Sequence, residues 1–223
     1  MTESSSRLRP AVTVLAVATL AAIALIGGIM VRPLVIDDSR DQQPTLSAVE
    51  VAFLQDMTAH HQQATEMGKL IDRDGIDPAV RNLGRQIATS QQFELGTMSG
   101  WLRLVGEPLN NPVPMAWMTR YAGTGQDDHH ASAVLTDDAA HQMPGMSTPD
   151  EVAALGSLPP TEAENRFLIQ MQRHHYGGIA MAQDLTARVP DGIVAQLAAS
   201  MISNQSKETG LMGTMLVARG VEP

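Results

Sequence analysis

The chain has 223 residues, no cysteine, and a formal charge of -9 at pH 7. This acidic balance argues against nucleic acid or an anionic lipid surface as a partner, because both attract basic proteins. The lack of cysteine excludes disulfides, thiolate metal sites and a lipid-modified cysteine anchor. Aromatic residues make up 3% of the chain and methionines number fourteen, which favours packed helices over a sheet.

The N-terminal region contains an uncharged apolar run at residues 11–31, with arginines at positions 7, 9 and 32. A helix of this length can cross a hydrocarbon layer of about 30 Å. We interpret residues 1–10 as a tail, 11–31 as a transmembrane anchor and 32–47 as a polar linker. A cleaved signal peptide is the alternative, but the run is long for one and lacks a small-x-small cleavage pattern at its end. The simplest topology is a single-pass cell-membrane protein with its main domain on the extracytoplasmic side.

One motif occurs twice at a constant offset of 114 residues. The pattern Phe-Leu-x-x-Met-x-x-His-His spans residues 53–61 and returns at 167–175, and a methionine follows each copy, Met67 and then Met181. The match continues without a gap as far as Gly106 and Gly220. Two copies of one unit therefore build the domain.

Each unit is predicted to be a helical hairpin. Apolar and histidine positions between 53 and 71 recur in steps of three and four, and a second stripe of this kind runs from 80 to 105. Thr45 or Ser47 can cap the first helix, and Asp77-Pro78 can start the second. Repeat one is residues 48–106 and repeat two is residues 160–220. Two such hairpins bury their stripes best against each other, so the sequence predicts an all-α four-helix bundle over residues 48–223.

The segment between the repeats, residues 107–159, is rich in Pro, Gly, Met and His and has no sustained period. We expect a long crossover with short helices near 115–122 and 149–155. Its His141, Met143 and Met146 resemble in composition a thioether-rich copper loop, which makes a second or gating metal site there a hypothesis.

The polar side chains of each hairpin are expected to meet inside the bundle. In a hairpin that turns near residue 75, His60 and His61 lie level with Gln91, and Met57 lies level with Glu94. The second repeat gives the same arrangement. Thioether and neutral imidazole suit Cu(I), and imidazole with carboxylate suits Cu(II). The candidate metal ligands are therefore Met57, His60, His61, Glu94, Met171, His174, His175 and Glu208, followed by Met67, Met98, Met181 and Met212.

Simpler interpretations of these residues stay open. Adjacent helix positions point about 100° apart, so one histidine of each pair could be exposed to water. The methionines could only fill the core. Glu94 and Glu208 could orient histidines rather than bind metal, and Gln91 and Gln205 are expected to make structural hydrogen bonds.

The motif resembles the family called domain of unknown function 305, a ferritin-like group of four-helix proteins, over residues 48–220. Repeat two departs from the usual pattern at Gly178, where alanine is expected. The turn from Met143 to Met146 also looks like the family's. The resemblance implies an exported protein that is related to copper-binding proteins.

We expect a membrane-anchored copper-binding protein that sequesters the ion or passes it on. A ferritin-like metal-dependent oxidase is the alternative from the enzymes, although Met-x-x-His stands where such di-iron proteins have Glu-x-x-His. A non-catalytic accessory subunit of an envelope complex is the third interpretation. The expected partners are a copper ion, the membrane through the N-terminal helix, and either a second copy or an envelope protein.

Overall fold

The computed structural model describes residues 45–121 and 143–222, and every regular element within these ranges is a helix. The four long helices are α2 (Ala48–Leu70), α3 (Pro78–Leu104), α6 (Pro160–Arg188) and α7 (Ile193–Ala218). Two short helices, α4 (Ala116–Tyr121) and α5 (Pro149–Ala154), belong to the crossover. The prediction of an all-α fold is confirmed. The tail, the anchor at 11–31 and most of the linker lie outside the described residues. Among residues 45–121 and 143–222, no helix has the length and apolar character needed to span a bilayer.

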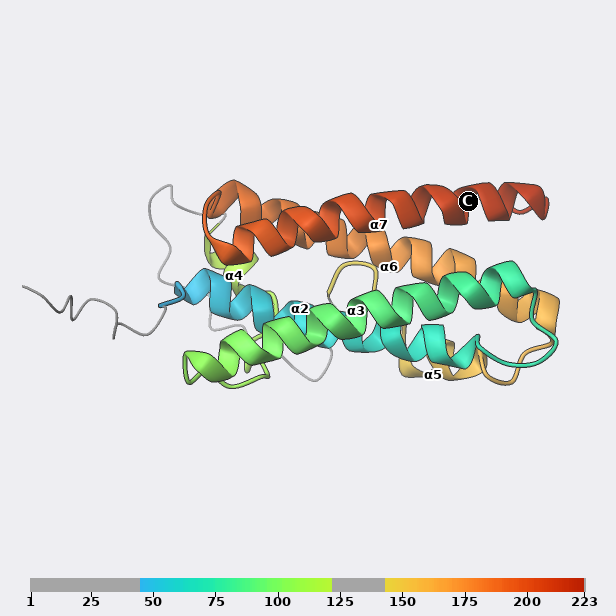
Figure 1. Ribbon diagram of the computed structural model, residues 1–223, viewed down its shortest axis with the longest axis horizontal. Coiled ribbons are helices and arrows are strands. Elements are labelled where there is room, and N and C mark those ends of the chain that lie inside the picture. Colours follow the sequence, from blue (N-terminus) through green and yellow to red (C-terminus); the bar gives the residue numbers. More distant parts are fainter. Residues whose placement is uncertain (1–44, 122–142, 223) are drawn as a thin grey trace, which may run out of the picture. The chain divides into compact units, whose positions relative to one another are not determined.

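The helices form two hairpins, α2 with α3 and α6 with α7 (Figure 1). Local sequence explains the ends of the first hairpin. Ser47 and Glu50 form a reciprocal capping box at the start of α2, so Ser47 caps this helix. Asp77 caps α3 through the backbone N–H of Ala79, directly before Pro78 in the first turn. Gly75 in the connecting turn has a φ of +84°, a conformation that costs glycine little.

The two hairpins meet mainly through α2 and α6. Within the first hairpin, α2 and α3 approach closely at two glycines. A Cβ atom added to Gly68 would lie 2.5 Å from the carbonyl oxygen of Gly84, so no larger residue fits there without movement. This close approach aligns α2 and α3 at a fixed height and thereby sets which residues of the two helices face each other.

The buried apolar residues form two clusters. One contains Phe53, Leu54 and Leu185 and includes Trp117 of α4, whose ring meets Phe53 edge to face at 5.8 Å. The other contains Ile71, Ile87 and Phe167 and includes residues of α5 and the turn after it. The crossover helices therefore complete the core of the described domain at both clusters.

Candidate metal centre

Four buried histidines form a row across the boundary between the hairpins. His60 and His61 come from α2, and His174 and His175 come from α6; each is at most 1% exposed. The ring centroids of His60 and His174 are 3.7 Å apart, whereas the separations within each pair are 6.4 and 6.3 Å. The inner histidine of each pair points to the other hairpin and the outer one to its own hairpin. Adjacent helix positions point in different directions, and here both directions lead into the protein interior. Neither ring of a pair is therefore exposed to water.

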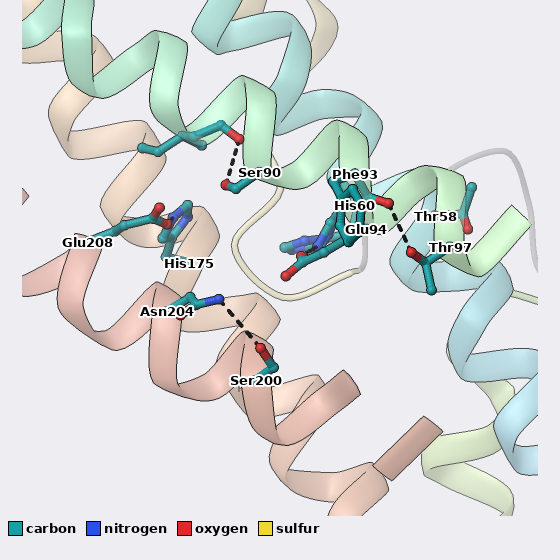
Figure 2. A network of polar contacts seen from close by, with 12 residues as sticks. Thr58, His60, Ser90, Phe93, Glu94, Thr97, His175, Ser200, Asn204 and Glu208 are labelled. Carbon is teal, nitrogen blue, oxygen red and sulfur yellow. Dashed lines mark hydrogen bonds and ion pairs between the residues drawn. The ribbon is translucent and has the colours of Figure 1, made fainter. Parts of the chain in front are cut away.

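The outer histidines each bond a glutamate on the second helix of the same hairpin. His61 Nε2 lies 2.6 Å from a carboxylate oxygen of Glu94, and His175 Nε2 lies 2.7 Å from one of Glu208. Figure 2 shows Glu208 of α7 beside His175 of α6. The glutamate side chains are only 12% and 21% exposed. The sequence predicted that Glu94 lies level with Met57. Its actual partner, His61, is one helical turn further along α2.

The inner histidines bond backbone carbonyls. His174 Nε2 donates to the carbonyl of His60 at 3.0 Å, and His60 Nε2 donates to the carbonyl of Pro144 at 3.1 Å. A carbonyl only accepts, so both rings are assigned the tautomer with the proton on Nε2. The carboxylate partners give the outer rings the same tautomer. Each of the four Nδ1 atoms is then an acceptor, and all four are buried without a hydrogen-bond partner.

Burial keeps the inner rings neutral. It is the main cause that lowers the pKa of His60 to about 3, and the neighbouring His61 adds to the effect. The pKa of His174 lies well below its ordinary value, mainly through burial and then through His60 and His175. A neutral imidazole with a free Nδ1 lone pair is the form that binds a metal ion. The inner histidines therefore need not lose a proton to bind a metal at pH 7.

The six methionines of the repeat are fully buried and divide between the two apolar clusters. Met57 and Met98 of the first hairpin share a cluster with Met181 of the second. Met171 and Met212 of the second hairpin share the other cluster with Met67 of the first. Each cluster thus holds a triple of repeat methionines drawn from both hairpins, and the repeat offset of 114 residues relates the members of one triple to those of the other. From the sequence, only Met57 and Met171 were placed, each level with the glutamate of its own hairpin, so the contact between methionines of different hairpins was not predicted.

Gln91 of α3 and Gln205 of α7 have buried side-chain amides. Neither the oxygen nor the nitrogen of the Gln91 and Gln205 side chains has a hydrogen-bond partner among the described protein groups, so the structure does not show the structural hydrogen bonds expected of them. A Cβ atom on Gly178 would lie 2.6 Å from Gln205 Oε1 and 3.2 Å from His60 Cε1. Gly178, which stands where repeat one has Ala64, therefore leaves room for the Gln205 amide and the His60 ring.

Within residues 45–121 and 143–222, no three His, Asp or Glu side chains converge into a ready-made metal site. The carboxylates of Glu94 and Glu208 are engaged with Nε2 atoms. Any site built from these residues must then combine Nδ1 atoms with thioether or amide donors, or rearrange when the ion enters. In the crossover, Met143 is buried and Met146 is half-buried, whereas His141 lies outside the described residues.

A family model named domain of unknown function (DUF305) matches residues 50–216. The chain belongs to this DUF305 family. No curated protein matches it.

Solved structures agree with this assignment. A DUF305 protein from Streptomyces coelicolor that is regarded as secreted is 35% identical, with a TM-score of 0.65 over 78% of this chain and 95% of its own. A DUF305 fragment from Deinococcus radiodurans is 29% identical, with a TM-score of 0.62 over 78% and 99%. CopM in its Cu(I)-bound form is 21% identical, with a TM-score of 0.51 over 78% and 98%. At this identity the likeness to CopM shows a shared fold.

The contact from His60 to Pro144 in this DUF305 chain was not predicted from the sequence. Pro144 acts through its backbone carbonyl, which no side-chain pattern reports. The available indication was a break in the repeat, because α6 has Gly177-Gly178 where α2 has Gln63-Ala64.

Proposed function

We propose that this DUF305 chain is a membrane-anchored, extracytoplasmic copper-binding protein that sequesters copper or passes it on. The observation that carries the proposal is the set of four buried Nδ1 atoms without partners, flanked by two triples of buried methionines. Imidazole nitrogen and thioether sulfur are donors that suit Cu(I). Copper is the cargo in this proposal, and the protein supplies affinity and exchange rather than catalysis.

The glutamates support the proposal as partners of the ligands. A histidine that binds a metal through one nitrogen commonly donates its other N–H to a carboxylate or a carbonyl. All four histidines already have this arrangement. Glu94 and Glu208 could also move to a Cu(II) ion as oxygen ligands, so the site would serve both oxidation states.

The extracytoplasmic location in this proposal rests on the uncharged run at residues 11–31 and on the similarity to a relative from Streptomyces coelicolor that is regarded as secreted. The CopM structures with Cu(I) and with Cu(II) bound add the precedent of copper on the same fold.

The oxidase alternative has weaker support. Di-iron oxidases of this architecture draw several carboxylates and two Glu-x-x-His motifs into the bundle. Among the residues that the structure describes, the glutamates bonded to the histidine row are Glu94 and Glu208, one for each outer histidine. Oxygen consumption by the purified chain with Fe(II) or Cu(I) would favour the oxidase over the copper carrier.

The test is a competition titration of the full-length chain with Cu(I) and a chromophoric chelator. Met57→Leu and Met171→Leu nearly conserve core volume while removing the sulfur, and together they should weaken Cu(I) binding, because thioether sulfur is a preferred Cu(I) donor. Met201→Leu is the matched control, because Met201 is equally buried but has Ile87 at its equivalent position in repeat one. Replacing all four histidines should remove binding, and unchanged stoichiometry in that variant would reject the proposal.

A further inference from the structure

The inner histidines are equivalent in the repeat, yet their hydrogen-bond partners differ. His174 Nε2 donates to the backbone carbonyl of His60, and exact repetition would pair His60 Nε2 with the carbonyl of His174. Instead it donates to Pro144. A loop of residues 143–147, which we call the MPGM loop, therefore breaks the internal symmetry at the centre of the row.

Both hairpins hold the MPGM loop in place. Gln63 of α2 accepts from the backbone N–H of Ser147 at 2.7 Å and donates to its carbonyl at 2.8 Å. Arg173 of α6 donates to the Ser147 hydroxyl at 2.9 Å. The side chains of Met143 and Ser147 are buried. The loop is thus bound to the bundle at several points around the bond from His60 to Pro144.

Two glycines create the space for this contact. Gly145 has a φ of +79°, and a Cβ atom on it would overlap the carbonyl oxygen of Arg173. A Cβ atom on Gly177 would overlap the carbonyl oxygen of Pro144. Glycine inside a helix costs about 1 kcal/mol relative to alanine, and repeat one has Gln63 at the position of Gly177. The glycine of α6 therefore lies where the loop backbone needs direct contact with the helix.

We propose that the MPGM loop is a positioning element that holds His60 in the tautomer with a free Nδ1, and that docking of the loop is coupled to metal binding at that atom. The first half concerns the metal-free protein alone. The second half rests on the proposed copper function.

The coupling follows from the chemistry of the ring. A cation on Nδ1 withdraws electron density and makes the Nε2 proton a better donor, so the bond to the Pro144 carbonyl strengthens when the ion is present. Linkage is reciprocal, so a docked loop must raise the affinity for the ion by the same factor by which the ion favours docking. Loss of such an outer partner typically costs about 10- to 100-fold in metal affinity.

The variant that tests the proposal is Gly177→Ala, whose added methyl group displaces the Pro144 carbonyl. Gly210→Ala is the matched control, because Gly210 is also a helical glycine but has nothing within 4 Å of an added Cβ. Gln63→Ala is the second variant. It removes two hydrogen bonds from the loop without adding bulk, so it serves if Gly177→Ala does not fold.

The first measurement uses the full-length metal-free chain labelled with ¹⁵N-histidine. In the wild type and in Gly210→Ala, His60 should show a pyridine-like Nδ1 and a pyrrole-like Nε2, and the amide hydrogen of Ser147 should exchange slowly. In Gly177→Ala, exchange should become fast and His60 should become a mixture of tautomers. A single unchanged tautomer in a variant with a released loop would overturn the positioning role.

The second measurement titrates the same proteins with Ag(I), a redox-inert stand-in for Cu(I). Gly177→Ala should bind Ag(I) at least about tenfold more weakly than Gly210→Ala, and Ag(I) should slow Ser147 exchange in the wild type. Equal affinities in the two variants would overturn the coupling. If the wild type binds neither Ag(I) nor Cu(I), the copper function fails, and the tautomer measurement alone decides the positioning role.

Discussion

The rings of His60 and His174 stack across the boundary between the two hairpins, with centroids 3.7 Å apart and planes inclined by 33°. Both rings lie in the core, where a charged imidazole is costly and two charged imidazoles also repel each other. The pair therefore joins the hairpins only while both histidines are neutral. This contact makes the stability of the bundle depend on pH.

We expect the free energy of unfolding to fall as the pH drops below about 6.5. The pKa of His60 is about 3 in the folded protein, and that of His174 is also well below its ordinary value near 6.5. The unfolded chain therefore binds more protons than the folded one in this window. The stabilisation is complete above pH 6.5 and decreases toward pH 3, by at most about 1.4 kcal/mol per pH unit for each histidine. Urea unfolding of the metal-free chain at several pH values measures the slope.

The control for this prediction is His60→Gln, which retains a donor near the position of Nε2 but cannot be protonated. Its stability should depend less steeply on pH between 6.5 and 4. An equally steep dependence in His60→Gln and in the wild type would show that other groups control acid unfolding.

We expect Glu94→Gln and Glu208→Gln to weaken copper binding by similar factors, each between about 10- and 100-fold. Both glutamates bond the outer histidine of their own hairpin at nearly equal distances, 2.6 and 2.7 Å. An amide can still accept the hydrogen bond, but it no longer makes the ring a stronger donor to the metal. Cu(I) competition titrations compare the two variants with Glu66→Gln, an exposed change on α2. A loss in only one variant would contradict the equivalence of the hairpins.

The sequence predicted the bundle well because its information is periodic. The stripes from 53 to 71 and from 80 to 105, together with the repeat, determine which helix faces are buried and which helices are neighbours. The sequence also predicted the height of each glutamate along the hairpin to within one helical turn of its histidine partner. This was possible because the position of a residue along an antiparallel hairpin follows from its number. The sequence could not show that His60 and Gln205 both lie against Gly178, because this depends on how α2 crosses α6 and on the space that the glycine leaves. The bond to Pro144 involves a backbone group of an aperiodic loop, so no pattern of side chains reports it.

We expect Asp56→Ala to release α4 from the bundle. One carboxylate oxygen of Asp56 accepts from the backbone N–H of Met115 at 2.7 Å and from the indole N–H of Trp117 at 2.9 Å. Met115 has a φ of +62°, a costly conformation for this residue that the bond helps to hold. Removal of the acceptor leaves buried donors unpaired, at a cost of about 1–3 kcal/mol.

The fluorescence of Trp117 measures the release of α4. In a Trp101→Phe background, the emission of Trp117 should shift to the red in Asp56→Ala. Asp56→Asn retains an acceptor oxygen and should shift less, and equal shifts would contradict the assigned role.

The stability of the first hairpin is expected to depend on the close approach of Gly68 and Gly84. Alanine at an exposed helical glycine normally stabilises a protein by about 0.5–1 kcal/mol, and we expect this gain for Gly96→Ala, where an added Cβ meets nothing within 4 Å. Gly68→Ala should instead destabilise the protein by about 1–3 kcal/mol, because the new methyl group meets the backbone oxygen of Gly84 at 2.5 Å.

The same substitution should also affect the metal site. Since α2 must then move away from α3, the distance from His61 to Glu94 should lengthen and copper affinity should fall as well. Repeat two has Ala182 and Ala198 at the equivalent positions, so its helices already pack with methyl groups at this crossing. Chemical denaturation and copper titration of both variants test the argument, and a Gly68→Ala protein that gains stability would show that the hairpin does not depend on this contact.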